Sequence, residues 1–165
     1  MSGLDGAGLD GPAVRHSGTV RQNTRGPEDH WARMLPATGQ GAPVPVLVVE
    51  DDPDDVRITF NALRGTGHLH PVHARVGSEA LEAARKGQFG VLVVDYRLPD
   101  MSGIELCRRL RLMGLGAPIL MTSSVESDEV VARAMSAGAS DFLVKSLDYA
   151  RQLEREVERL AVAAG

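Results

Sequence analysis

Several things are scarce in this sequence. It contains one cysteine, Cys107, so it cannot form an intramolecular disulfide, which suits a reducing cytoplasm. It has no apolar run long enough to cross a bilayer, and its N-terminus lacks the basic segment and apolar core of a secretory signal. The net charge of −4 gives no basic excess for neutralising the phosphates of nucleic acid. We therefore expect a cytoplasmic protein with no membrane insertion and no direct nucleic-acid binding.

Lysine is scarce as well. The chain has 18 Lys and Arg residues, but only Lys86 and Lys145 are lysines. Lysine carries a compact charge on a flexible stem, whereas arginine carries a wide planar fork, so the two are not interchangeable at a crowded site. Lys86 lies at the polar end of an expected helix, beside Gly87, and needs no special explanation. Lys145 directly follows an apolar run, which makes it a candidate functional cation.

The N-terminal part of the chain has a different composition from the rest. Residues 1–44 are rich in Gly, Pro, Ser, Thr and Asn without sustained periodicity, which predicts a disordered tail before one domain over residues 45–165. The single tryptophan, Trp31, lies in this tail. A short helix from Pro27 would place Trp31, Met34 and Leu35 on one face, as in a docking peptide. The alternatives are an idle tail and an upstream extension of a chain that starts at Met34.

From residue 45 onward, apolar and helical patterns alternate. Continuous apolar runs cover residues 46–49, 91–94, 118–121 and 142–144, with a weaker candidate at 71–76, as expected for parallel strands buried on both faces. Helical patterns cover residues 53–63, 78–86, 102–113, 128–137 and 148–163, with Asp52 and Ser78 as expected N-caps. This alternation predicts an α/β fold, a (βα)5 doubly wound parallel sheet.

Polar side chains follow four of the apolar runs. In chain order these are Glu50, Asp51 and Asp52, then Asp95, then Thr122, Ser123 and Ser124, and finally Lys145. Ligands bind outside the carboxyl ends of the strands in an open parallel sheet. Three strands thus deliver charged groups to one edge of the sheet, and a fourth delivers hydroxyl groups.

Helix capping explains part of the acidic run, because acids at the start of a helix suit its dipole. The acids explained in this way are Asp52, Asp54 and Asp55. Capping does not explain Glu50, which directly follows a buried strand. Glu50, Asp51 and Asp95 would repel one another unless a cation lay among them. Hard oxygen donors with room for water favour Mg²⁺ or Mn²⁺.

Asp95 is the candidate reactive group. Beside a bound metal ion, a carboxylate can attack phosphorus and form an acyl phosphate. Lys145 would then pair with one phosphoryl oxygen, and Ser123 would donate a hydrogen bond to another.

Four stretches of the chain together resemble a known family. They are VLVVEDD (46–52), VVDYRLPDMSG (93–103), MTSS (121–124) and AGASDFLVK (137–145). From about residue 46 to residue 160 the chain resembles bacterial two-component response-regulator receivers, of the single-domain type without an output domain. The resemblance implies a flavodoxin-like strand order of 2-1-3-4-5. It also implies a non-enzymatic switch that takes a phosphoryl group from a sensor histidine kinase or phosphotransfer protein and signals to a downstream protein.

The resemblance also implies roles for the metal-binding residues. Asp95 matches the phospho-acceptor. Glu50 and Asp51 match the acidic pair, with Asp51 the more direct metal ligand, and the backbone carbonyl of Arg97 would complete the protein ligands.

A second group of implied roles concerns the switch. Lys145 matches the family's lysine, Ser123 rather than Thr122 matches the switch hydroxyl, and Phe142 matches the aromatic that repacks. Ser146 stands where the family usually has proline, so we expect a trans Lys145–Ser146 bond, because a cis bond before serine would cost about 2.5–4 kcal/mol. Phosphoryl lifetime in the family depends on the residues two positions past the hydroxyl and the acceptor, which here are Val125 and Arg97.

Three rival functions remain for this pattern. A phosphatase of the haloacid-dehalogenase type, which forms an aspartyl phosphate, would have an acid in place of Arg97. A flavodoxin-like nucleotide or flavin binder would have a Gly-rich or Ser/Thr-rich loop after the first strand, where this chain has acids. A receiver-like interaction module that works without phosphorylation would not need both Asp95 and Lys145.

Overall fold

The computed structural model describes residues 33–35 and 41–164. The expected disordered tail lies almost wholly outside the described residues, as does Trp31. Residues 33–35 are described, and there Met34 and Leu35 pack against the apolar core. None of the described helices combines the length and apolar character that crossing a bilayer requires.

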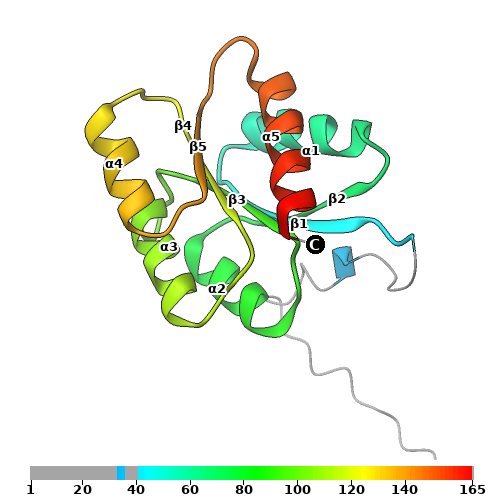
Figure 1. The fold of residues 1–165 in the computed structure, drawn as a ribbon, viewed down its shortest axis with the longest axis horizontal. Helices are drawn as coiled ribbons and strands as arrows, with labels where there is room; N and C mark the ends of the chain where they lie inside the picture. Colours follow the sequence, from blue (N-terminus) through cyan, green and yellow to red (C-terminus); the bar gives the residue numbers. More distant parts are fainter. Residues whose placement is uncertain (1–32, 36–40, 165) are drawn as a thin grey trace, which may run out of the picture.

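Five strands and five helices alternate along the chain (Figure 1). The strands are β1 (Val44–Val49), β2 (Leu69–Ala74), β3 (Val91–Asp95), β4 (Ile119–Ser123) and β5 (Asp141–Val144). The helices are α1 (Pro53–Gly65), α2 (Gly77–Lys86), α3 (Gly103–Leu112), α4 (Asp128–Ser136) and α5 (Tyr149–Ala164). All four strand pairs are parallel, in the order β2-β1-β3-β4-β5. The predicted fold class and strand order are confirmed.

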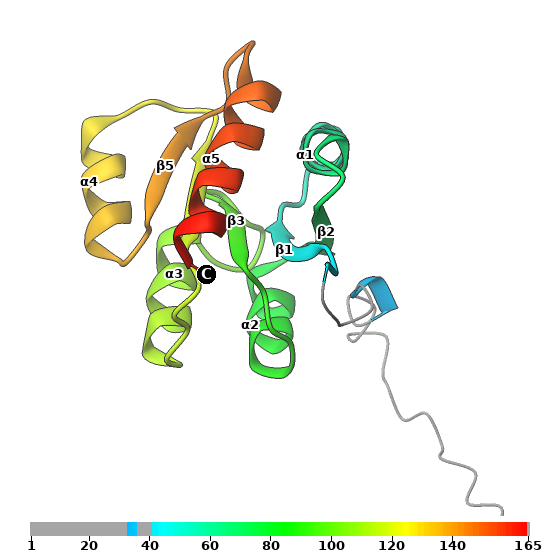
Figure 2. The ribbon, with the colours of Figure 1, turned by 45° about the vertical axis from the view of Figure 1, so that its right-hand side comes forward.

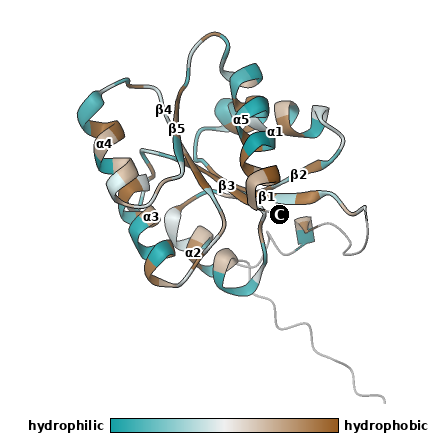
Figure 3. Ribbon diagram, viewed as in Figure 1, coloured by the Kyte–Doolittle hydropathy of each residue, from teal (hydrophilic) through white to brown (hydrophobic). Residues whose placement is uncertain are grey.

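Helices cover both faces of the sheet (Figure 2). α1 and α5 pack on one face, and α2, α3 and α4 pack on the other. Successive side chains of a strand point to opposite faces, so Leu92 and Val94 of β3 join the α2–α4 side of the core while Val91 and Val93 join the α1/α5 side. Burial on both faces explains why the central strands read as continuous apolar runs. Figure 3 shows these strands as apolar, with the polar helix surfaces outside them.

The observed helix N-caps match only some of the N-caps predicted from the sequence. Asp52 caps α1 as expected, accepting hydrogen bonds from the backbone N–H groups of Asp54 (2.8 Å) and Asp55 (3.2 Å). The prediction that Ser78 caps α2 is wrong. The N-cap is Val76, which offers no side-chain acceptor, and the carboxylate of Asp100 accepts from the first N–H groups of α2, both at 2.8 Å. A cap supplied from a distant loop leaves no local signal.

At the amino-terminal end of the sheet, Arg111 of α3 joins two loops, the one between α3 and β4 and the one between α4 and β5. Its Nε donates to the carbonyl of Gly138 (2.9 Å), and its Nη1 donates to the carbonyls of Leu115 and Ala117 (both 2.7 Å). Gly138 has a left-handed φ of +102°, and a Cβ atom there would lie 2.7 Å from Cγ of Arg111. Glycine is therefore required here both by the backbone conformation and by the arginine stem.

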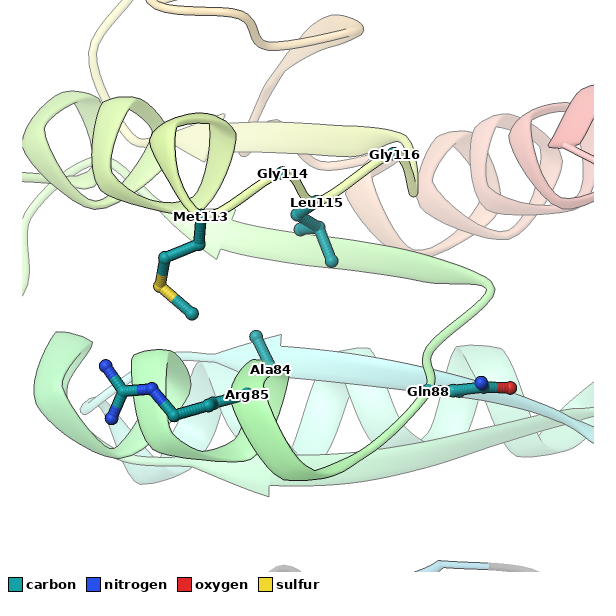
Figure 4. A pocket seen from close by; sticks show the side chains of 7 residues that line it. All are labelled: Ala84, Arg85, Gln88, Met113, Gly114, Leu115 and Gly116. Carbon is teal, nitrogen blue, oxygen red and sulfur yellow. The ribbon is translucent and has the colours of Figure 1, made fainter.

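A cavity of about 560 Å³ opens at the same end of the sheet, between α2 and the loop after α3. Figure 4 shows Met113 and Leu115 pointing across it toward Ala84 and Arg85 of α2. No predicted site residue lines this cavity, so the predicted chemistry must lie elsewhere.

Candidate functional site

The parallel register gathers the predicted site residues at the carboxyl ends of the strands. Val49 pairs with Val94, so the next residues along β1 and β3, Glu50 and Asp95, are neighbours. In the same way Ser123 at the end of β4 pairs with Val144, and Lys145 follows at once. The structure therefore brings Glu50, Asp95, Ser123 and Lys145 to one edge, as the sequence predicts.

Lys145 lies among three carboxylates. Its Nζ is 2.6 Å from Oε2 of Glu50, 2.7 Å from Oδ1 of Asp95 and 2.7 Å from Oδ2 of Asp55. An ammonium group has three hydrogens to donate, and these three partners take all of them. Burial by itself would lower the pKa of Lys145, but hydrogen bonds to the three carboxylates outweigh it and raise that pKa above the ordinary lysine value. The group is therefore a permanent cation at the centre of the site.

Glu50 is held from two directions. Its Oε1 accepts from the backbone N–H groups of Asp51 (3.1 Å) and Asp52 (3.0 Å), and its Oε2 accepts from Lys145. Burial raises the pKa of Glu50 above the usual glutamate value, and these hydrogen bonds oppose that shift without cancelling it. The carboxylate is thus fixed in position, facing Lys145.

Asp95 is also held through both oxygens. Oδ1 pairs with Lys145, and Oδ2 accepts from the backbone N–H of Arg97 at 2.7 Å. The loop after β3 folds back on the backbone of Asp95: Gly103 donates to the carbonyl of Tyr96, and a Cβ at Gly103 would lie 2.4 Å from the Asp95 carbonyl oxygen. Glycine at position 103 is required by this close approach, and the loop in turn fixes the Asp95 side chain.

Asp51 differs from Glu50 and Asp95 because it is exposed and makes no side-chain hydrogen bond or ion pair within residues 33–35 and 41–164. In that part of the chain no three His, Cys, Asp or Glu side chains form a ready metal cluster, because Glu50, Asp55 and Asp95 converge on Lys145 instead. A hard divalent ion that keeps several waters needs fewer protein donors. Asp51, Asp95 and the carbonyl of Arg97 fit that kind of donor set.

The two candidate hydroxyls at the end of β4 lie on opposite faces of the sheet, because neighbouring strand residues alternate. Ser123 shares the face of Met121, where Phe142 packs against the core, and its Oγ accepts from the backbone N–H of Val125 at 3.0 Å. Thr122 shares the face of Tyr149. This arrangement favours Ser123 as the hydroxyl that works with Phe142.

The sequence pattern does not show two features of the site. It assigns Asp55 to the helix dipole alone, whereas the Asp55 side chain also binds Lys145. A side chain three residues after the N-cap can reach back over the start of the helix, but no local pattern identifies a partner 90 positions away. The second feature is the hydrogen bond from the guanidinium of Arg97 to Oγ of Ser124 (2.8 Å), which joins the loops after β3 and β4. The Lys145–Ser146 bond is trans as predicted, because the described residues contain no cis peptide bond.

Comparison with protein families gives one match, to the response regulator receiver domain, over residues 46–157. Among curated proteins, the chain is 37% identical over 105 residues to the probable transcriptional regulatory protein TcrX of Mycobacterium tuberculosis, covering 64% of this chain and 44% of that protein. It is 33% identical over 118 residues to the transcriptional regulatory protein ZraR of Salmonella typhimurium, covering 72% and 26%. The chain therefore spans less than half the length of these relatives, which are named as regulators and not as enzymes.

Solved structures show the same fold. The chemotaxis protein CheY4 of Vibrio cholerae has a TM-score of 0.67 and 29% identity, covering 72% of this chain and 99% of that one. A putative response regulator from Chloroflexus aurantiacus has a TM-score of 0.66 and 30% identity, covering 73% and 98%.

Proposed function

This chain belongs to the response regulator receiver domain family, and from that membership we propose that Asp95 accepts a phosphoryl group from a sensor histidine kinase or phosphotransfer protein. One Asp95 oxygen attacks the phosphorus of a phosphohistidine, the N–P bond breaks, and the imidazole leaves with a proton as the O–P bond forms. The observation that carries the proposal is the fixing of the Asp95 carboxylate by Lys145 and by the Arg97 N–H. Such positioning accounts for much of the catalysis in phosphoryl transfer.

Charge is the main obstacle to the transfer. Three carboxylates already share the Lys145 ammonium, and the arriving phosphoryl group is itself anionic. Mg²⁺ or Mn²⁺ bound by Asp51, Asp95 and the Arg97 carbonyl would supply the missing positive charge. Glu50 would remain in place beside these ligands, keeping its hydrogen bonds to the backbone and to Lys145.

Ser123 would transmit the effect of phosphorylation from the site to the rest of the domain. Its hydroxyl would donate to a phosphoryl oxygen, giving up the hydrogen bond that it now accepts from Val125. The movement would open space on that face of the sheet for Phe142, which is half-buried against the core. A downstream protein would then recognise the changed surface of α4, β5 and α5. This surface would thus have two states, one for each state of Asp95.

Acetyl phosphate provides the direct test. With Mg²⁺ present, an intact-mass measurement should show the gain of one phosphoryl group by the wild type. Asp95→Asn should gain none, and Asp54→Asn, which makes the same charge change on an exposed side chain, should be labelled like wild type. Labelling of Asp95→Asn at the wild-type level would show that the acceptor is elsewhere. A wild type that takes no phosphoryl group would favour the phosphorylation-independent interaction module.

The metal assignment has its own test. Asp51→Asn should weaken Mg²⁺ binding, followed by titration, much more than Asp54→Asn does. Both variants remove one carboxylate from neighbouring positions, so a general charge effect would lower the affinity equally. Equal losses would remove Asp51 from the proposed ligands.

A further inference from the structure

A question raised by the proposed function is which Lys145 partner gives way when the phosphoryl group arrives. The ammonium has no spare hydrogen, since Glu50, Asp55 and Asp95 take all three. A phosphoryl oxygen can bind Lys145 only if one of these pairs lengthens or breaks.

Glu50 is poorly suited to move. Its side chain is 6% exposed, and its second oxygen accepts from the backbone N–H groups of Asp51 and Asp52. Breaking its pair with Lys145 would leave a buried, immobile carboxylate without its cation, which is costly. Asp95 is the acceptor itself, so it stays in the site whatever happens to its charge.

Asp55 differs from both. Its side chain is 33% exposed, and its carboxylate has no other hydrogen bond within the described residues. It comes from the first turn of α1 and not from a strand end, so it can turn toward water without disturbing the sheet. Of the three partners, it is the one that loses least by releasing Lys145.

We propose that Asp55 holds the Lys145 ammonium in the unphosphorylated protein and is displaced from it by a phosphoryl oxygen. The inference rests on the proposed function and makes Asp55 a positioning residue that acts through Lys145. While paired, it competes with the phosphoryl group for the cation, and once displaced it faces that group as a like charge. Both effects act against the phosphorylated state, so Asp55 should slow phosphorylation and speed the loss of the phosphoryl group.

The neighbouring residue provides a matched control. Asp54 lies one position earlier in the same helical turn, its side chain is 77% exposed, and it pairs with Arg57 at 3.0 Å. Asp54→Asn and Asp55→Asn make the same change in net charge and nearly the same change at the helix N-terminus. A difference between the two variants therefore reports the contact with Lys145.

The experiment compares wild type, Asp54→Asn, Asp55→Asn and Asp55→Glu with acetyl phosphate and Mg²⁺ at low salt. Intact mass gives the rate at which each protein gains a phosphoryl group and, after the donor is removed, the rate at which it loses it. Asp55→Asn should be labelled about three- to fivefold faster than Asp54→Asn and should lose its label more slowly by a similar factor. Asp55→Glu, which restores a carboxylate, should return toward wild type in both rates.

The two rates also separate this role from a purely structural one. A variant that only loosened the fold would be labelled more slowly. Faster gain of the phosphoryl group together with slower loss therefore cannot come from damage to the fold. Equal rates for Asp55→Asn and Asp54→Asn, with the wild type labelled, would overturn the inference alone. Slower labelling of Asp55→Asn would also overturn it, by showing that Asp55 assists the transfer. A wild type that takes no label would remove the proposed function and the inference together.

Discussion

Lys145 and Arg111 lie at opposite ends of the same sheet, and each holds several oxygen atoms. Lys145 contacts three carboxylates at the carboxyl end of the strands. Arg111 contacts three backbone carbonyls and the Ser140 hydroxyl at the amino end. The number of contacts is similar, but the partners are charged side chains in one case and mainly neutral backbone in the other.

The two kinds of partner allow different behaviour. A backbone carbonyl cannot leave without moving its loop, so the Arg111 contacts only hold structure, and a planar fork with fixed donors suits them. A carboxylate side chain can exchange its place with another anion, so the Lys145 contacts can respond to a ligand. The chain uses arginine for nearly all its cations, yet the cation at the carboxyl end, where partners would need to exchange, is a lysine.

The largest effect is expected from removing the cation of the carboxyl end. Lys145→Met leaves Glu50, Asp55 and Asp95 facing one another and should lower the free energy of unfolding at pH 7 by about 3–5 kcal/mol. Burial already raises the pKa of Glu50 in the folded state above its unfolded value. The folded variant therefore binds protons more readily than the unfolded chain, and its stability should rise as pH falls from 7 toward 4.5, the ordinary pKa of a glutamate.

Urea unfolding at pH 7.5 and pH 5 measures both effects. The contrast between the two ends would break down if Lys145→Met were as stable as wild type, or if its loss of stability did not depend on pH.

Removing the Arg111 cation should lower the free energy of unfolding by a smaller amount. Arg111→Met leaves carbonyl groups that water can reach, because the region is only partly buried. We expect a loss of about 2–3 kcal/mol in the free energy of unfolding, the value of charge-assisted hydrogen bonds. The loss should not change between pH 5 and pH 8, and the rate of labelling by acetyl phosphate should match wild type. A marked fall in that rate would mean that the two ends of the sheet are coupled.

A smaller effect is expected from the glycine that the arginine packs against. Gly138→Ala forces a side chain into a left-handed backbone conformation and against Cγ of Arg111. The expected loss is about 1–2 kcal/mol. Gly67 has a similar φ of +76° with nothing near its Cβ position, so Gly67→Ala isolates the backbone part of the cost. If the two variants lose the same amount in thermal unfolding, the contact with Arg111 contributes nothing.

The smallest change in stability, and the sharpest test of the contrast, is to exchange the kind of cation. Lys145→Arg keeps the charge and should change the free energy of unfolding by about 1 kcal/mol or less. The wider guanidinium should nevertheless hold the phosphoryl group in the wrong place for Ser123 and Phe142. Amide exchange across residues 130–160, compared before and after full phosphorylation, should show a reduced change.

The reciprocal variant, Arg111→Lys, should keep that phosphorylation-dependent change in full. A full wild-type response from Lys145→Arg would show that Lys145 acts only as a charge, and that its scarcity in the sequence has no meaning at this site.

Most of the fold could be predicted from the sequence because burial on both faces leaves a strong pattern in the central strands. The apolar pattern places β2 two residues too late, because β2 is an edge strand whose residues His70, Pro71 and His73 interrupt that pattern. In the site, strand ends identified Glu50, Asp95, Ser123 and Lys145, since parallel strands end at one edge. The Asp100 cap and the Asp55–Lys145 pair join residues 22 to 90 positions apart, and no local pattern marks such contacts.

The contacts of Lys145 also bear on the order in which the domain assembles. The cation lies 95 positions after Glu50 and 90 after Asp55, directly after β5, the strand at the far edge of the sheet. Contacts between distant parts of a chain tend to form late, because closing the intervening loop costs entropy. Until β5 docks on β4, the acids of the earlier strands repel one another with no ammonium between them. Fraying of this edge strand would therefore disable the proposed acceptor while most of the fold remained intact. Such local opening is a low-energy event in many domains.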